Sequence, residues 1–382
     1  MFLAHARRDS ELSKLFSGSD EGSFVSFSTG EGFQVQPDRL PESLISSAAM
    51  HVLLRSEPTS TVEALTEAVG ELLARTRRLI SGEREEALMI TALGGLAVSP
   101  GVRIWTPWGD LRAATPTEQM WQPGERGPFA RAPEAILEST VPLGARIGEA
   151  YPGQDDSFRD LTISTRILVG VERVSLAVLL AQGDARPVAP WWLWQTLIAP
   201  FGYEVSDNLV GRAFTFRALG PRRQPTPTTL TAEEQPTIKE WSERVEEHYD
   251  PAIDVAVRRT LSAVRERADS ADALIDAVIS WENLFGHGEA SEVMFRVTAA
   301  LAHLLEKDPR KRAKFQGDLK KIYGLRSRVL HGGEVKPKDD LEGRKEAAIA
   351  FSVRALRELF LEKPHLVAEK ERGMQLILGT VE

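Results

Sequence analysis

Apolar and polar residues follow two different periods along this chain. Before a Pro- and Thr-rich stretch, short alternating segments are mixed with helical spacing, whereas after it the spacing is helical almost throughout. Ser23–Pro37 alternates around Gly30 and Gly32 and predicts a β-hairpin. Thr61–Ile80 carries apolar residues at helical spacing and predicts a helix. We therefore expect an α+β N-terminal domain followed by an all-α domain.

The other segments of the N-terminal part are shorter and less regular. Ala87–Val98 and Val102–Trp105 predict strands, and Gly211–Leu219 alternates as a further strand would. Pro190–Trp194 is predicted to open a helix. Arg166–Ala181 is a long apolar run that fits a buried helix and a buried strand alike, because periodicity does not separate the two.

The C-terminal part predicts a series of helices with short connections. Thr237 and Glu240 have the spacing of a capping box and are predicted to begin the first helix. Asp250 is placed to cap the next helix, with Pro251 in its first turn. The helices predicted after this cap are Ala252–Ala268, Ser270–Phe285, Ala290–Glu306, Arg310–Leu330 and Leu341–Leu361. Short connections favour antiparallel neighbours, so we expect these helices to form a bundle.

These patterns divide the chain of 382 residues into two domains and two connecting or terminal segments. Residues 1–220 are expected to form an α+β sensor or recognition domain. Residues 221–237 are rich in Pro and Thr and are expected to be a linker. Residues 238–365 are expected to form the helical bundle, and residues 366–382 a C-terminal tail.

Composition narrows the class of protein. The chain has no cysteine, which excludes disulfides, thiol catalysis and Cys-held zinc or iron–sulfur sites. Its net charge of −8 argues against a protein that coats nucleic acid without specificity. The N-terminus lacks the apolar core of a signal peptide, and no uninterrupted apolar run is long enough to cross a bilayer. We expect a cytoplasmic protein that does not bind membranes.

Positive charge is concentrated between Lys307 and Arg328. Nine basic residues stand there against Asp308 and Asp318, a net charge of +7. The basic residues are Lys307, Arg310, Lys311, Arg312, Lys314, Lys320, Lys321, Arg326 and Arg328. Such a run is either a solvated face of a helix or a patch that attracts phosphate groups.

The run leads into Tyr323–Gly333, which carries Arg326 and His331 beside two glycines. Histidine can give or take a proton near neutral pH, and arginine can grip a phosphate with two N–H groups. Five residues along an ideal helix turn through about 500°, so the two side chains start about 140° apart. They converge poorly within one helix unless the last turn loosens, with Gly332 in a left-handed cap, or a twofold partner supplies one of them.

Three segments together resemble the HEPN superfamily, and more closely its Apea-like branch. They are Ala273–Gly286, Glu292–Phe315 and Ile322–Gly333, and the resemblance covers roughly residues 240–365. It implies an antiparallel helical bundle. Many members are metal-independent endoribonucleases that dimerise to bring two Arg and His motifs together, and others are inactive modules that bind nucleic acid or protein. It also places such proteins among toxins and anti-phage abortive-infection effectors.

The resemblance implies roles for particular residues. Arg326 and His331 would be catalytic, and Glu282 would orient one of them from a facing helix or else be a solvated carboxylate. If the chain is not an enzyme, His331 caps a helix and Arg326 pairs with an acid. Tyr323 either stacks on a base or packs in the half-buried surface. The residues expected to bind RNA are Lys320, Lys321, Tyr323, Arg328, Arg310, Lys311 and Arg312. No metal and no cofactor are expected, and the expected partners are RNA and a second copy of the chain, joined through the C-terminal bundle.

Two other features are weaker candidates. Arg296 and His303 satisfy a looser form of the same motif, but they lie among apolar residues and are interpreted as a structural or surface pair. Trp105 and Trp108 either form a recognition surface with Arg112 or pack in the core and turns, which is commoner. The trigger that the N-terminal domain would detect is not specified by any motif.

Overall fold

The computed structural model describes much of the chain. The described residues are 23–28, 32–35, 44–45, 47–49, 51–52, 62–120, 132–149, 163–184, 187–198, 227–265, 269–287, 292–336 and 339–379. The chain forms two compact units. The first is made of Met1–Arg103, Trp108–Val171 and Trp192–Ala218, and the second of Ile104–Pro107, Glu172–Trp191 and Leu219–Glu382. Each unit is described by itself.

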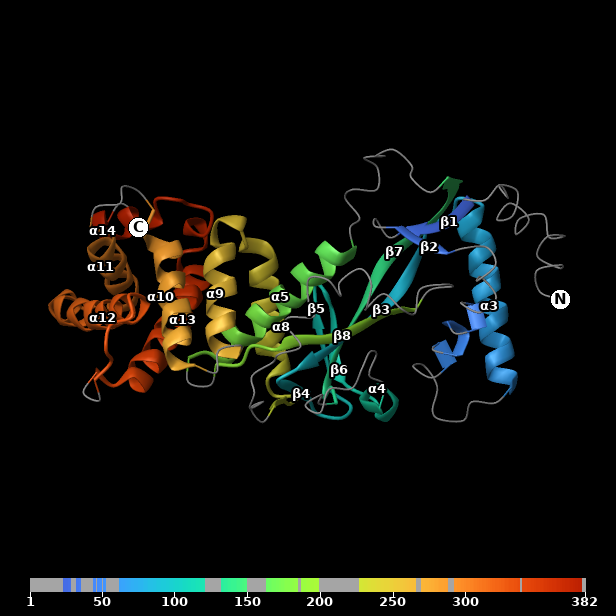
Figure 1. The fold of residues 1–382 in the computed structure, drawn as a ribbon, viewed down its shortest axis with the longest axis horizontal. Helices are drawn as coiled ribbons and strands as arrows, with labels where there is room; N and C mark the ends of the chain where they lie inside the picture. The colour runs from blue at the N-terminus through green and yellow to red at the C-terminus, as the bar shows by residue number, and fades with distance from the viewer. Residues whose placement is uncertain are drawn as a thin grey trace. The chain divides into compact units, whose positions relative to one another are not determined.

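The protein is mixed α+β, and its β-sheet is antiparallel where registers are defined (Figure 1). Part of the sheet has the strand order β2-β1-β7-β3-β8, and β6 also pairs with β7. The strands are β1 (Ser23–Ser28), β2 (Gly32–Val35), β3 (Glu85–Gly94), β4 (Leu96–Val98), β5 (Arg103–Thr106), β6 (Gly109–Ala113), β7 (Ala135–Glu149), β8 (Trp191–Ile198) and β9 (Thr228–Leu230). The predicted hairpin at Ser23–Pro37 is confirmed as β1 and β2, which pair from Val25 with Val35 to Ser28 with Gly32.

Strand β7 organises the first unit. Its residues 135–143 pair with β3 along one edge, while on the other edge 135–138 pair with β6 and 144–149 with β1. Figure 1 shows β7 running between β1 and β3. Helix α3 (Val62–Ile80) packs against β7. The residues that α3 buries recur every three or four positions, as its sequence predicted, and are Ala68, Leu72, Thr76 and Leu79.

The structure resolves one ambiguous segment and corrects one prediction. Arg166–Ala181 belongs to helix α5 (Ile163–Gln182). The prediction that Pro190–Trp194 opens a helix is wrong, because these residues lead into strand β8. The run is too short to show a helical period, and tryptophan is favoured in strands. The strand predicted at Gly211–Leu219 lies outside the described residues.

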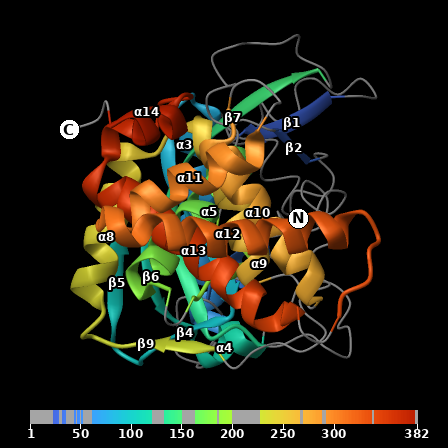
Figure 2. The ribbon, with the colours of Figure 1, turned by 90° about the vertical axis from the view of Figure 1, so that its left-hand side faces the viewer.

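The second unit contains a series of helices after β9, as the sequence predicted. They are α8 (Gln235–His248), the 3₁₀ turn η3 (Pro251–Ile253), α9 (Asp254–Arg265), α10 (Ser270–Phe285), α11 (Val293–Leu305), α12 (Pro309–Leu330), α13 (Leu341–Glu362), the 3₁₀ turn η5 (Pro364–Leu366) and α14 (Arg372–Leu378). Helix α10 contacts α9, α11, α12, α13 and α14 and forms the middle of this group (Figure 1). Helices α11 and α12 contact each other and lie on the side that Figure 2 turns toward the viewer.

The start of α8 differs from the prediction. The helix begins at Gln235, so Thr237 and Glu240 lie inside it and form no capping box. Glu234 instead accepts hydrogen bonds from the amide and the hydroxyl of Thr231, at 2.7 and 2.9 Å. Pro236 can occupy the first turn of a helix because its missing N–H would have no partner there, which allows the earlier start. Of the predicted linker, 228–230 form β9, 235–237 belong to α8, and 221–226 lie outside the described residues.

Part of the predicted C-terminal tail, 366–382, is folded. Helix α14 contacts α10 and α11. Arg372 is fully buried and donates to the carbonyl oxygens of Leu284, Leu366 and Val367 at 2.7–3.1 Å. A Cβ on Gly373 would lie 2.7 Å from the carbonyl oxygen of Phe285, so the close approach of α14 to the end of α10 requires glycine.

Candidate functional site

Glu282 on α10 joins two residues of the predicted motif. Its Oε2 accepts a hydrogen bond from Nη2 of Arg326 at 2.8 Å, and its Oε1 accepts a short one from the Tyr323 hydroxyl. The side chains of Arg326 and Glu282 are 14% and 24% exposed, so the ion pair is only partly screened by water. Tyr323 and Arg326 are three residues apart on α12 and so point the same way. The alternative that Glu282 is merely a solvated carboxylate is therefore wrong.

The hydroxyl of Tyr323 is held in its protonated form. Burial, the hydrogen bond to Glu282 and the charge of that carboxylate raise the pKa of Tyr323 from 10.0 to about 12. Its ring lies 5.8 Å from the guanidinium carbon of Arg326, and its side chain is half-buried. These contacts favour a packing role for Tyr323, because its ring and hydroxyl are already engaged by the protein and are not free to stack on a base.

Arg326 retains a hydrogen-bond donor that no described residue satisfies. Its Nε is buried and has no partner among the described residues, although Nη2 is bonded to Glu282. A buried donor without an acceptor carries a desolvation cost of about 1–3 kcal/mol. An oxyanion could reach this donor only if the side chains that cover Nε move, and it would then remove that cost.

His331 lies where α12 ends. It is the C-cap residue, and its amide bonds to the carbonyl oxygen of Ser327 at 3.2 Å. Gly332 has φ of +70°, and the amides of Gly332 and Gly333 donate to Val329 and Arg328 at 3.0 and 2.8 Å. This pattern is a Schellman motif, which confirms the predicted left-handed glycine cap. The side chain of His331 is exposed beyond the helix end.

The structure joins three of the predicted residues and leaves the fourth apart. Arg326, Glu282 and Tyr323 form one polar cluster. Within the described ranges, no hydrogen bond or ion pair links the side chain of His331 to Arg326 or to Glu282. In the described part of one chain, His331 is therefore not tied to the polar cluster by a side-chain hydrogen bond or ion pair.

The residues predicted to bind RNA differ in how firmly they are held by neighbours. Arg328 pairs with Asp339 and Lys321 with Asp318, both at 2.7 Å, and Lys311 lies 3.8 Å from Asp308. Arg312 donates to the carbonyl oxygen of Glu306 at 3.1 Å, and Arg310 is exposed. Lys320 lies over the ring of Phe295, with 5.1 Å between Nζ and the ring centroid. The acids paired with Arg328, Lys321 and Lys311 offset part of the predicted charge.

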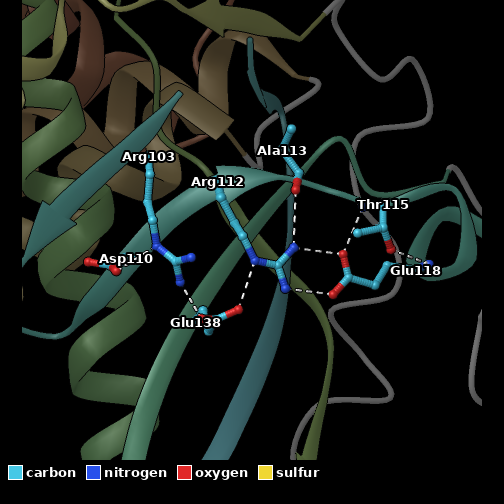
Figure 3. A network of polar contacts seen from close by, with 7 residues as sticks. All are labelled: Arg103, Asp110, Arg112, Ala113, Thr115, Glu118 and Glu138. Carbon is cyan, nitrogen blue, oxygen red and sulfur yellow. Dashed lines mark hydrogen bonds and ion pairs between the residues drawn. The ribbon is translucent and has the colours of Figure 1, made fainter. Parts of the chain in front are cut away.

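Arg112 is held by two carboxylates in the first unit (Figure 3). Its Nη1 and Nη2 donate to both oxygens of Glu118 at 2.8 and 2.7 Å, and its Nε donates to Glu138 at 2.8 Å. Glu118 is fully buried and also accepts from the amide of Thr115, whose hydroxyl accepts from the amide of Glu118. This capping box begins helix α4 (Pro116–Met120). Arg112 thus has a structural role and does not form a recognition surface.

Arg103 extends the same network. It donates to Asp110 at 2.7 Å and, through a shorter hydrogen bond, to Glu138 (Figure 3). Burial alone would raise the pKa of Glu138, but the hydrogen bonds and charges of Arg112 and Arg103 outweigh burial and lower it. The carboxylate of Glu138 is therefore stabilised in its charged form.

Two of the weaker sequence candidates also have defined positions. Arg296 and His303 both lie on α11 and are half-buried, which is consistent with a structural or surface pair. Burial and the nearby charge of Arg312 lower the pKa of His303. Trp105 is 47% exposed, with Nζ of Lys239 5.7 Å from its ring centroid.

Comparison with known proteins identified no similar protein. No family model, no curated protein and no solved structure matches this chain. In the described ranges, no group of three or more His, Asp or Glu side chains is placed to hold a metal ion. Among the described helices, none combines the length and apolar composition needed to cross a membrane.

Proposed function

We propose that the chain is a metal-independent endoribonuclease of the HEPN type, with its site at the end of α12. The observation that supports this best is Arg326, which is fixed by Glu282 through Nη2 and still carries a buried Nε without a partner in the described residues. His331 follows five residues later on an exposed helix end. Together they supply an anion-binding group and a proton-transfer group near a basic helix.

In the proposed reaction, His331 takes the proton of the ribose 2′-hydroxyl while water protonates the leaving 5′-oxygen, or His331 protonates the 5′-oxygen while water takes the 2′-hydroxyl proton. The 2′-oxygen attacks the neighbouring phosphorus, the bond to the 5′-oxygen breaks, and a 2′,3′-cyclic phosphate forms. Arg326 stabilises the negative charge that develops on the phosphate oxygens. Glu282 holds the guanidinium in place, and Tyr323 in turn fixes Glu282.

The proposal includes a homodimer. No hydrogen bond or ion pair joins the side chains of Arg326 and His331 in the described residues of one chain, so in this proposal a complete site combines Arg326 of one copy with His331 of the other. A twofold axis near the end of α12 would form two such sites. The first unit would then respond to a trigger, as expected of a toxin or an anti-phage abortive-infection effector. That role rests on the two-unit organisation of the chain.

A non-enzymatic function is the second candidate, and one observation favours it. Arg326 already has a carboxylate partner, and in the described residues no hydrogen bond or ion pair links the side chain of His331 to Arg326 or to Glu282. A bundle with this arrangement would bind nucleic acid or a protein partner without cleaving RNA. The two candidates differ in whether RNA is cut.

The test uses the purified full chain and single-stranded RNA labelled at its 5′-end. We expect cleavage that persists in excess EDTA and leaves a 2′,3′-cyclic phosphate. The cleavage rate should fall at least about 100-fold in His331→Ala and in Arg326→Ala, the size typical of acid–base groups. His365→Ala is the matched control, because His365 is also an exposed histidine near the end of a helix. Cleavage by His331→Ala at the normal rate would contradict the mechanism. Intact RNA with the wild type, while the chain binds it, would favour the binding module.

A further inference from the structure

An exposed apolar pair begins helix α11. Met294 is 42% exposed and Phe295 is 47% exposed, although α11 buries most of its other apolar side chains in the bundle. Exposed apolar side chains are normal when they stand alone, so this pair indicates a binding surface only together with the residues around it. The sequence around Phe295 gives no sign of this exposure, because the residue falls among apolar residues at helical spacing.

Phe295 lies beside the basic helix. Gln316 reaches Thr298 across the two helices at 3.5 Å, and Nζ of Lys320 lies 5.1 Å from the centroid of the Phe295 ring. The first turn of α11 is therefore level with Lys320. Helix α12 continues past that level to Leu330. Arg326 is six residues further on, which corresponds to about 9 Å along the helix axis.

The surroundings of this aromatic residue are basic. Lys314 and Lys321 are exposed near Lys320 on α12, and the run from Lys307 to Arg328 has nine basic and two acidic residues. Proteins that bind single-stranded nucleic acid combine a positively charged track for the backbone with aromatic rings on which bases stack. A lysine held over a ring combines both elements at one place.

Resting on the nuclease function proposed above, we propose that Phe295 with Lys320 is a stacking platform for an unpaired base of single-stranded RNA. The RNA backbone would follow α12 from Lys320 toward Arg326. Duplex RNA has its bases paired and stacked inside the helix, so this platform would select single-stranded segments. The substrate class is therefore RNA that is unpaired next to the cleaved bond.

A second aromatic and lysine pair in the same unit serves as a comparison. Trp105 has the same exposure of 47%, and Lys239 lies 5.7 Å from its ring centroid. Lys239, however, is 3.9 Å from Glu243, and Glu240 is the next residue. Because acids surround this pair, it does not attract a polyanion. It provides a matched control for the effect of an exposed aromatic side chain as such.

The experiment measures RNA binding by the full chain in the His331→Ala background, which prevents turnover. Phe295→Leu keeps an apolar side chain and removes the aromatic face, so folding should be retained. We expect it to weaken binding of a single-stranded oligonucleotide about 5- to 150-fold, the ratio that corresponds to stacking of one base. Binding of a duplex should change less than twofold, Phe295→Trp should bind as well as the parent or better, and Trp105→Leu should have no effect.

The outcomes separate this inference from the nuclease proposal. Equal affinity of Phe295→Leu and its parent for single-stranded RNA would overturn the platform, even if the wild type cleaves RNA through His331. Loss of dimerisation in Phe295→Leu, with RNA affinity per monomer unchanged, would overturn it too and assign the patch to a second copy. Conversely, reduced binding in Phe295→Leu alongside undiminished cleavage by the His331→Ala chain would support the platform and reject the proposed mechanism. If the chain binds no RNA, both proposals fail.

Discussion

At the scale of single residues, the protein uses carboxylates to fix arginines. Glu282 holds Arg326 from a facing helix, and Glu118 and Glu138 hold Arg112 within the first unit. The two arginines differ in whether every guanidinium nitrogen has an acceptor. All three nitrogens of the Arg112 guanidinium donate to protein oxygens, whereas Nε of Arg326 has no acceptor in the described residues. Of these two arginines, only Arg326 therefore keeps a guanidinium donor that the described residues do not satisfy.

The influence of Glu282 on Tyr323 can be measured directly. Glu282→Gln keeps a hydrogen-bond acceptor and removes the charge, so we expect the pKa of Tyr323 to fall from about 12 toward its ordinary value of 10.0. The phenolate absorbs in the ultraviolet, and the chain has four tyrosines, so one shifted titration can be resolved. Tyr323→Phe identifies the signal. An unchanged titration in Glu282→Gln would show that burial alone sets the pKa.

The Arg112 network predicts a large cost for one substitution. Arg112→Ala leaves the fully buried Glu118 without its cation, so we expect a loss of about 3–5 kcal/mol in the free energy of unfolding. Urea unfolding measures this loss. Replacing both partners, as Arg112→Met with Glu118→Gln, should cost clearly less, because no buried charge is then left unpaired. Equal losses in the single and double variants would contradict the assigned pairing.

The same network predicts an acid sensitivity with a defined sign. The folded pKa of Glu138 lies below its ordinary value of 4.5, so its contribution to stability is complete above that pH. As the pH falls below about 4.5, the unfolded chain binds the proton first and the free energy of unfolding decreases. Glu138→Gln should flatten this dependence. A steeper dependence in the variant would show that the pKa of Glu138 is not lowered.

At the scale of elements, helix ends decide where the proposed chemistry is placed. Helix α10 begins and ends as the sequence predicts, because Asp269 caps the amides of Ala271 and Asp272 and Gly286 follows its last turn. Helix α12 ends in the glycine motif that exposes His331. These boundaries are local, so a sequence is sufficient to predict them. The segment at Pro190–Trp194 lacked such signals and was predicted wrongly.

Two glycines, one within α12 and one just after its end, predict opposite effects of the same substitution. Gly332 has φ of +70° and Gly317 is helical, and a Cβ on either would meet no atom within 4 Å. Gly332→Ala should destabilise the protein by about 1–2 kcal/mol because an L-residue is strained in the left-handed region. Gly317→Ala should stabilise it by about 0.4–1 kcal/mol, since alanine restricts the unfolded chain. Thermal unfolding of both variants checks the signs, and a stabilised Gly332→Ala would exclude the cap.

At the scale of the whole molecule, the separation of Arg326 and His331 makes the proposed site dependent on two chains. Mixing Arg326→Ala with His331→Ala chains should restore cleavage, because half of the dimers are mixed and each mixed dimer has one intact site. We expect about a quarter of the wild-type rate after subunit exchange. Each variant alone should remain inactive. Failure to complement, with exchange demonstrated, would show that both residues of a site come from one chain.

The sequence by itself determined most helices of the second unit, the caps at Asp250 and Gly332 and the concentration of basic residues before Arg326. These depend on neighbouring residues, as the hydrogen bond from the amide of Ala252 to Asp250 and the stop of α12 at Gly332 illustrate. Only the tertiary structure decided that Glu282 accepts from both Tyr323 and Arg326, and that Phe295 lies beside Lys320. Those contacts join different helices, up to 44 residues apart. They depend on how the helices pack against each other, and no local pattern specifies that packing.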